Sequence, residues 1–438
     1  MQNKKMSAPR LLVGSFLVLI LLGSLLLSMP WAAHTPTSYV DALFTSATSV
    51  CITGLLVVDT GTHWTLLGQI IILLLIQVGG LGVMAFAGFF AMLMGRKIHL
   101  RERLLMQQSI NVSAVGGIVR VFKYLLGFTF LLEALGAIIL AIKWAPLMGL
   151  KRALWFGLFH SVSAFNNAGI DLFGSFKSLT AFKHDITVNI IISLLVIIGG
   201  LGFYVCYELY NYRKNRKLSL HSKVVLFTTV ILIVLGTVLL LAVEYNHALK
   251  ALTPGHKLMA AFFHSVSSRS SGFSTLDINS LLLPSQLILI IFMFIGASPG
   301  STGGGIKTTT VALMVAVVMA QLRGKKDIEI FERRIEDSDI YPSFTLFFMA
   351  IFLLLIMTLL VSLTNPADFT KILFDVTSAL GTVGLSTGLS TELNAFGKVL
   401  LVICMFLGRV GPLTLGFALA YKKKQPEIHY ARGKIMIG

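Results

Sequence analysis

The chain has 438 residues, of which 55% are hydrophobic and only 13% are charged, and its formal net charge is +17. A soluble core of this length cannot bury so much apolar surface, so the composition excludes a water-soluble domain and predicts a polytopic membrane protein. The three cysteines and ten histidines show no metal-ligand spacing, so we predict neither a resident metal ion nor a bound cofactor.

Apolar runs of helical length follow one another along the chain. The first, 11–29, has the length of a secretory signal, but no small-residue cleavage site follows it, and we expect a retained spanning helix. The sequence predicts an all-α protein with eight spanning segments: 11–29, 66–94, 124–142, 186–207, 224–243, 281–295, 344–363 and 396–421. We expect four helix–pore loop–helix repeats with the boundaries 1–97, 98–216, 217–325 and 326–438.

Positive charge is concentrated in particular connections between these segments. Of the 36 Lys and Arg residues, 24 lie in the amino terminus, the carboxyl-terminal tail and the connections 96–123, 213–223 and 323–334. Basic residues mark the cytoplasmic ends of membrane-spanning segments. We therefore expect both termini in the cytoplasm, contact of the basic face with anionic lipid, and no nucleic-acid partner.

A short motif recurs once in each of the four units. Its copies are FTSATSVCITGL from Phe44, FHSVSAFNNAGI from Phe159, FHSVSSRSSGF from Phe263 and FDVTSALGTVGL from Phe374. The motif glycines Gly54, Gly169, Gly272 and Gly384 are 115, 103 and 112 residues apart, and the third copy is one residue shorter when its HSVS is aligned with the second. Recurrence at this period indicates a fourfold internal repeat whose loops surround an axis.

The composition of these loops suits the dehydration of a cation. Loops of small residues can direct several backbone carbonyls at one line, and glycine permits the close approach that a side chain would block. A single such glycine equally suits the cap of a short helix. Four copies between apolar segments favour a cation filter. Asp59 and Asp171 follow two of the loops, and they either make the outer mouth of this filter negative or are ordinary loop acids.

A second glycine-rich stretch, GASPGSTGGGIKTTT, occupies residues 296–310. It follows an apolar run of only 15 residues, which is short for a membrane crossing. Irregular backbone at membrane depth must be buried in protein or line a watery cavity. A nucleotide-binding P-loop does not fit, because Ile306 separates the glycines from Lys307. We expect this stretch to be a gate below the filter.

Three other features of the sequence have both a functional and a plainer structural interpretation. Arg409 lies about midway along 396–421, which favours a role in the ion path over a structural ion pair. The GGLG sequences at 79–82 and 199–202 need no role beyond close helix packing. The mixed-charge segment 323–341 is either a solvated loop or short helix, or a docking surface for a partner.

The combination of SAFNNAGI, SSRSSGFST, PGSTGGGIKTTT and GRVGP with the four units resembles the Trk/Ktr/HKT superfamily of potassium transporters. Within that superfamily the chain is most similar to the membrane subunit of bacterial Ktr potassium uptake systems. The resemblance implies potassium uptake across the bacterial cytoplasmic membrane through a channel-like pore, often with the help of sodium. It also implies a homodimer on a cytoplasmic RCK-type ring of nucleotide-binding regulatory subunits.

The resemblance also implies which residues bind and gate the ion. The implied potassium filter consists of Ile52, Thr53, Gly54, Asn167, Ala168, Gly169, Ser270, Ser271, Gly272, Thr382, Val383 and Gly384. The implied intramembrane gate consists of Gly296, Gly300, Ser301, Thr302, Gly303, Gly304, Gly305, Lys307 and Arg409.

Other classes of membrane protein remain as alternatives. The chain could be a Trk-type or sodium-permeable transporter of the same superfamily. An alternating-access carrier also uses broken helices, but four parallel units argue against the inverted repeats of such carriers. A membrane enzyme would need a constellation of His, Asp or Ser near one surface, and the sequence offers none.

Overall fold

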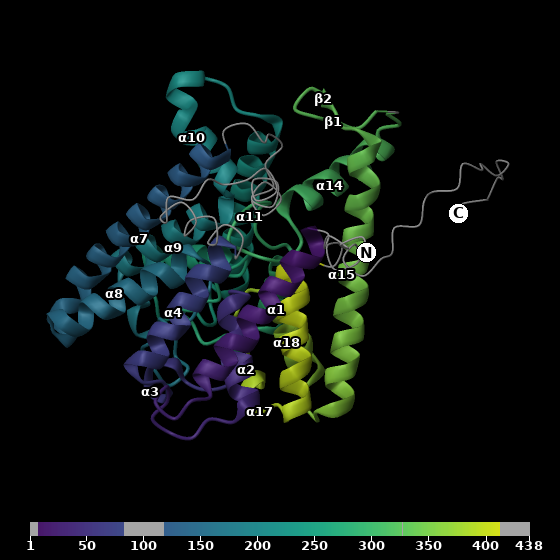
Figure 1. Cartoon of the computed structure of the whole chain (residues 1–438). Coiled ribbons are helices and arrows are strands. Elements are labelled where there is room, and N and C mark those ends of the chain that lie inside the picture. The colour runs from purple at the N-terminus through teal and green to yellow at the C-terminus, as the bar shows by residue number, and fades with distance from the viewer. Residues whose placement is uncertain (1–7, 83–117, 326, 412–438) are drawn as a thin grey trace, which may run out of the picture.

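The computed structural model describes residues 8–82, 118–325 and 327–411, and nearly all of their regular structure is helical (Figure 1). The first described segment contains α1 (Ala8–Leu27), α2 (Tyr39–Val50), α3 (Thr60–His63) and α4 (Leu66–Leu81). The next contains α7 (Ile118–Met148), α8 (Leu150–Phe165), η1 (Thr180–Phe182), α9 (Ile186–Leu201), α10 (Phe203–Asn215), α11 (Leu220–Glu244), α12 (Pro254–Ser267), η2 (Ile278–Ser280), α13 (Leu283–Phe294) and α14 (Thr308–Leu322). The last contains β1 (Glu329–Ile330), β2 (Arg333–Arg334), α15 (Asp337–Thr364), α16 (Phe369–Gly381), α17 (Leu389–Glu392) and α18 (Ala395–Val410).

Four helices of the described segments, α1, α7, α11 and α15, are long and apolar enough to cross a membrane. The bent pair α9 and α10 makes a fifth span if its halves count as one, and α4, α13 and α14 are apolar but shorter. Large apolar side chains such as Leu131 on α7 and Phe352 on α15 are more than half exposed, as expected for helices that meet lipid. The chain is therefore a multi-pass membrane protein, while the number of eight spans stays a prediction.

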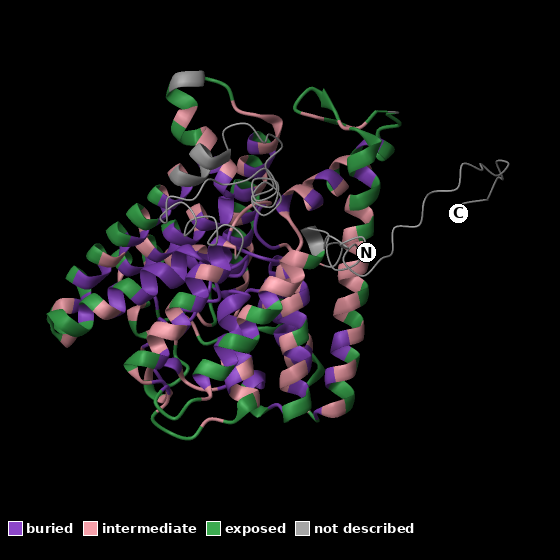
Figure 2. Cartoon of the chain, in the orientation of Figure 1, coloured by how far each residue is buried: buried purple, intermediate pink, exposed green. Residues whose placement is uncertain are grey.

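Buried residues gather at the centre of the molecule, where the short helices and their loops meet (Figure 2). The phenylalanine that opens each copy of the motif lies there, and all four rings are almost completely buried: Phe44, Phe159, Phe263 and Phe374. The helices that carry them, α2, α8, α12 and α16, are 12 to 16 residues long, too short to cross a bilayer. Burying the central face of each short helix therefore holds the loop that follows it inside the protein.

The prediction of one continuous helix over 186–207 is wrong. Gly202 has a φ of +95° and separates α9 from α10, which bends away by 99°. A Cβ on Gly202 would come within 2.6 Å of the Pro299 carbonyl oxygen, and Phe203 N donates to Gly300 O at 2.9 Å. The helix is interrupted because the 296–310 loop packs into the break.

Helices α4 and α18 also end at a glycine with a positive φ. Helix α4 ends before Gly82 (φ +87°), and α18 ends before Gly411 (φ +86°). The remaining parts of the predicted helices 66–94 and 396–421 lie outside the described residues, as do most of the basic connection 96–123 and the carboxyl-terminal tail. Arg409 therefore lies at the end of a described helix and not midway along one.

The mixed-charge segment 323–341 contains a short hairpin and the start of α15, so the alternative of a plain loop or short helix is wrong, while that of a docking surface stays a prediction. Its strands β1 and β2 form an antiparallel hairpin in which Ile330 pairs with Arg333. Phe331 at the turn packs edge-on against Phe227 of α11, with ring centroids 5.6 Å apart. Lys325 donates to Glu329 Oε2 at 2.8 Å, and this bond lowers the pKa of the Glu329 carboxyl. The hairpin and α10 lie at one end of the molecule, opposite α3 and α17 (Figure 1).

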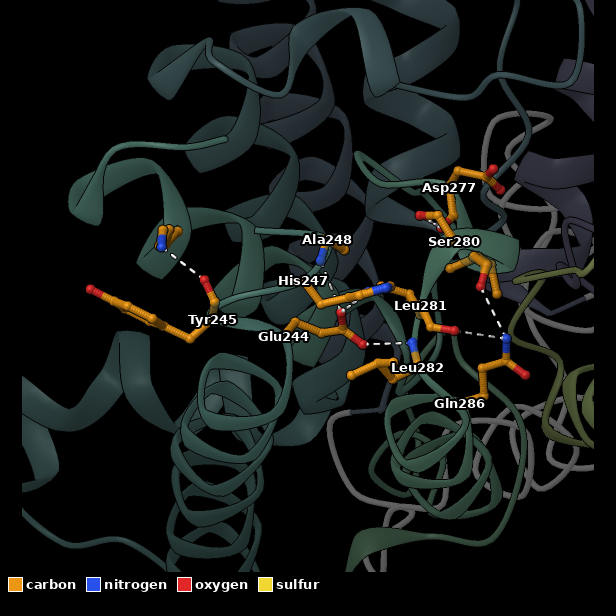
Figure 3. A network of polar contacts seen from close by, with 11 residues as sticks. Glu244, Tyr245, His247, Ala248, Asp277, Ser280, Leu281, Leu282 and Gln286 are labelled. Atoms are coloured by element: carbon orange, nitrogen blue, oxygen red, sulfur yellow. Dashed lines mark hydrogen bonds and ion pairs between the residues drawn. The ribbon is translucent and has the colours of Figure 1, made fainter. Parts of the chain in front are cut away.

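A buried carboxylate fixes the start of α13 (Figure 3). Leu282 precedes this helix and has no side-chain oxygen to cap it, but Glu244 at the end of α11 accepts from Leu282 N at 2.8 Å. The other carboxylate oxygen of Glu244 accepts from Ala248 N and meets His247 Nδ1, each at 3.2 Å. A carboxylate at a helix N-terminus satisfies free amides and the helix dipole, so Glu244 joins two helices of the third unit.

Candidate ion pathway

The four motif loops, residues 52–54, 167–169, 270–272 and 382–384, contact one another in a closed ring. A Cβ on each loop's glycine would overlap the carbonyl oxygen of the residue before another loop's glycine. The pairs are Gly54 with Ala168, Gly169 with Ser271, Gly272 with Val383, and Gly384 with Thr53. Each loop therefore meets the next in chain order, and the fourth meets the first. Only glycine leaves room for so close an approach.

The backbone of these loops is strained at matching positions. The four glycines have φ between +65° and +97°. Two residues earlier, Ile52, Asn167 and Thr382 also have positive φ, between +50° and +58°. The third loop has no such residue at Ser270 because it is one residue shorter. Non-glycine residues are uncommon in this region, at a cost of about 1–3 kcal/mol each, so the surrounding contacts must hold them there.

The last turn of each short helix supports its loop. The amide before the glycine donates to a Ser or Thr carbonyl five residues back: Thr53 N to Thr48 O at 2.8 Å, Ala168 N to Ser163 O at 2.7 Å, and Val383 N to Ser378 O at 2.9 Å. In the third loop Ser271 N donates to Ser267 O at 3.0 Å, only four residues back. This shift by one residue agrees with the shorter third copy of the motif.

The residue after each motif phenylalanine has a role that the sequence analysis missed. In three copies its side chain accepts from a backbone amide 12 residues later: His160 from Leu172 N at 3.3 Å, His264 from Leu276 N at 3.2 Å, and Asp375 from Thr387 N at 2.9 Å. These bonds tie the segment beyond the motif loop back to the short helix. Thr45 takes the equivalent place in the first copy but bonds to Asp41 O instead. The sequence signal for this role is the position of these residues, each directly after the phenylalanine of its motif copy.

Replacement of Asp375 by alanine is expected to destabilise the fourth loop. The buried carboxylate accepts from Ser386 Oγ at 2.7 Å and from Ser390 N at 3.2 Å, besides Thr387. Unpaired buried donors cost about 1–3 kcal/mol each, so the melting temperature in detergent should fall by several degrees. Asp368→Ala is the control, because Asp368 is exposed and its side chain caps nothing. Equal melting temperatures for both variants would contradict the role of Asp375.

A cavity of about 920 Å³ opens on one side of the ring and is lined by all four motif glycines. Asp171, Asp277, Lys177 and Lys183 also line it, so its wall carries both signs of charge. Asp59 does not line it. The Asp59 carboxylate accepts from the amides of Gly61, Thr62 and Phe176 at 3.0–3.1 Å, which makes it a structural loop acid.

The 296–310 loop lies directly against three of the four motif loops. Thr302 Oγ1 is 2.7 Å from the side-chain amide of Asn167, and Gly304 N donates to Thr382 Oγ1 at 3.0 Å. Gly303 lies against the side chain of Ser270. None of the described residues in this loop lines the cavity. The implied filter and gate residues are thus in contact.

Arg409 joins this loop to two other units. Its guanidinium donates to the carbonyl oxygens of Thr302 and Gly79, and to Gly80 O at 3.2 Å. Lys307 Nζ donates to Gly303 O at 2.8 Å within the loop itself. Arg269, beside the third motif loop, is buried, and its side-chain Nε has no hydrogen-bond partner in the described part of the chain. Three basic side chains, Arg269, Lys307 and Arg409, therefore lie beside the ring or on the loop packed against it.

Comparison with known proteins identifies the family. The model of the TrkH family, described as cation transport protein, matches residues 6–429. The chain belongs to the TrkH family. Its fold agrees, because the crystal structure of the potassium transporter TrkH from Vibrio parahaemolyticus superposes with a TM-score of 0.77 at 19% identity, covering 96% of this chain and 86% of that one.

Several relatives of this TrkH-family chain match over almost its full length. It is 38% identical to the Ktr system potassium uptake protein B of Bacillus subtilis, covering 99% of this chain and 97% of that protein. It is 35% identical to the potassium/sodium uptake protein NtpJ of Enterococcus hirae, covering 100% of this chain and 98% of that protein. It is 36% identical to the Ktr system potassium uptake protein B of Vibrio alginolyticus, covering 98% and 95%. The chain is thus a cation transporter of the TrkH/Ktr family, which is not a class of enzymes.

Proposed function

We propose that this chain takes up potassium across the bacterial cytoplasmic membrane through a pore formed by the four motif loops. The observation that carries the proposal is the closed ring of four glycines, each packed against a carbonyl oxygen of another loop. Such a ring can replace the hydration shell of a dehydrated cation with backbone oxygens. Two of the named relatives are potassium uptake proteins of Ktr systems, which supports potassium as the cargo.

The four units with boundaries 1–97, 98–216, 217–325 and 326–438 are each proposed to supply one quarter of this pore. Support comes from the contacts of the loops in chain order and from the equivalent bonds that His160, His264 and Asp375 make. The cavity would be the outer vestibule, and the cytoplasmic face would carry the hairpin, α10 and both termini. The 296–310 loop and Arg409 would close the inner side.

Tracer flux into reconstituted vesicles tests the proposed function. Vesicles that hold the purified chain should accumulate radioactive potassium down an imposed gradient, and unlabelled potassium should compete better than sodium. Empty vesicles are the control. Flux that saturates and requires an opposing substrate gradient would instead identify an alternating-access carrier, and no potassium flux at all would refute the proposal.

Sodium is proposed to assist this uptake. One relative, NtpJ of Enterococcus hirae, is named a potassium/sodium uptake protein. The motif loops are chemically unequal, so the ring need not reject sodium as strictly as four identical loops would. Added external sodium should lower the potassium concentration that gives half-maximal flux, whereas choline at equal ionic strength should not.

Regulation is proposed to come from a cytoplasmic, nucleotide-binding subunit ring that binds a homodimer of this chain. The names of the Ktr relatives describe them as parts of a system, which supports a partner. The exposed hairpin residues Arg333 and Arg334 offer positive charge at the end of the molecule expected to face the cytoplasm. An acidic patch on the partner would complement them.

Charge reversal at Arg333 and Arg334 is expected to weaken this association. Arg334 also pairs with Asp327 at 3.2 Å, but both side chains are largely exposed, so the fold should tolerate the change. Co-purification with the regulatory subunit should fall at low salt, where exposed charges are least screened. The exposed pair Lys151 and Arg152, reversed in the same way, is the control. Parental co-purification at every salt concentration would rule out this surface.

A further inference from the structure

Two of the three strained motif-loop residues are held by the 296–310 loop, and the third is not. Asn167 (φ +58°) and Thr382 (φ +50°) each contact that loop through a side-chain polar group. Ile52 (φ +53°) has an apolar side chain that can make no such bond. The backbone conformation of two filter loops therefore depends on a segment that belongs to neither of them.

Thr302 makes the first of these contacts. Its completely buried hydroxyl lies 2.7 Å from the Asn167 side-chain amide and 3.1 Å from Gly199 O. The amide also lies 3.0 Å from Ser270 Oγ, so it bridges the second motif loop, the third and the 296–310 loop. In a site without water access, a side chain so bonded cannot rotate away at low cost.

Thr382 makes the second contact, in which the loop is the donor. Gly304 N donates to Thr382 Oγ1 at 3.0 Å, and Gly305 lies close to Gly381 O. A side chain at Gly304 would overlap the Thr382 hydroxyl, so this glycine is required for the contact. The first contact lies beside Arg409, which bonds to Thr302 O.

We propose that Thr302 and Thr382 are positioning residues that couple closure of the 296–310 loop to the cation selectivity of the ring. The proposal rests on the proposed function, in which the ring is the filter and the loop is the gate. When the loop is seated, its two hydrogen bonds hold Asn167 and Thr382 in the left-handed conformation. When the loop leaves, both residues lose a partner and the second and fourth filter loops can relax.

Such coupling is reciprocal. A cation that fits the ring only while Asn167 and Thr382 are held must stabilise the seated loop by the same free energy with which the loop favours that cation. Potassium and sodium differ in the spacing of the oxygens that they prefer, so they should favour the seated loop unequally. A purely structural role for the two threonines would change stability but would leave the seating of the loop insensitive to which cation is present.

The test compares Thr302→Val and Thr382→Val with the parent. Valine keeps the branched shape at each position and removes only the hydroxyl. In equilibrium competition of sodium with labelled potassium on the purified chain, where the seated loop holds the ring, each variant should lower the preference for potassium over sodium by at least about fivefold, the lower end of typical coupling effects. Thr302→Ser restores the hydroxyl and should restore the preference. Thr237→Val is the matched control, because the Thr237 hydroxyl bonds to Ile233 O within α11, away from the ring.

A second readout reports the loop directly. Ser301→Cys places a thiol in the loop, and its labelling by a water-soluble thiol reagent should be slowed by potassium more than by sodium. Adding Thr302→Val or Thr382→Val should abolish that difference between the ions. The parent chain corrects for its buried cysteines Cys51, Cys206 and Cys404. The two valine substitutions remove different hydrogen bonds. If one variant fails to fold, the other still tests the coupling.

The outcomes separate this proposal from the proposed function. Parent vesicles that carry no potassium would refute the proposed function and the coupling with it. Parent vesicles that carry potassium, together with folded valine variants that keep parental selectivity and ion-dependent labelling, would refute the coupling alone. The coupling is supported if the valine variants lose both the preference for potassium and the ion dependence of labelling, and if Thr302→Ser recovers both.

Discussion

Gly384→Ser is expected to lower the apparent affinity for potassium by about tenfold or more and to reduce the preference for potassium over sodium. Gly384 has a φ of +97°, and a Cβ there would overlap the Thr53 carbonyl oxygen and press on the Gly54 backbone. The ring would have to open at the contact between its fourth and first loops. A strain of about 1–3 kcal/mol corresponds to roughly five- to 150-fold in an equilibrium constant.

The measurement is the concentration dependence of potassium flux into vesicles, with sodium as competitor. Gly54→Ser, whose Cβ would meet the Ala168 carbonyl, should behave similarly. Gly127→Ser is the control, because Gly127 lies on the exposed face of α7 with no atom within 4 Å of its Cβ position. If both loop variants keep parental kinetics, the glycine ring does not bind the transported ion.

Deletion of residues 301–305 is expected to raise basal potassium flux and to make it less dependent on the regulatory partner. The deletion removes both hydrogen bonds of the loop to Asn167 and Thr382, and the carbonyl acceptor of Arg409 on Thr302. Arg409→Ala should act in the same direction but more weakly, because the loop keeps its bonds to Asn167 and Thr382. A charged hydrogen bond contributes about 1.5–3 kcal/mol, so its loss should shift the gate equilibrium by about tenfold or more.

Flux with and without the partner subunit measures this effect, and gel filtration in detergent establishes that each variant is folded. Arg409→Lys is informative beside Arg409→Ala, since lysine keeps the positive charge but cannot donate in several directions from one rigid plane. Arg152→Ala, at an exposed arginine of α8, is the control. Flux at or below the parental level in the folded deletion variant would show that the 296–310 loop is structural and that the gate lies elsewhere.

Some properties of this protein are determined by its sequence alone. Membrane location follows from composition, because a soluble core of this length cannot bury so much apolar surface. The four motif copies identified the glycines that meet in the ring. The third copy is one residue shorter, and Ser271 N accordingly bonds four residues back where the other loops bond five residues back. Residues 296–310 could be assigned to the protein interior, because irregular backbone cannot face lipid.

Only the tertiary structure decided how these parts meet. GGLG at 199–202 suits a continuous packed helix as well as a broken one, and α9 breaks at Gly202 because Pro299 and Gly300 approach it from elsewhere in the chain. The hairpin strands are two residues long, too short for any periodicity to reveal. Arg409 was expected in the ion path, yet its acceptors on Thr302, Gly79 and Gly80 come from two other units. Hydropathy and motif spacing record local preferences, whereas the ring, the broken helix and the contact between the 296–310 loop and the motif loops arise from packing between segments far apart in the chain.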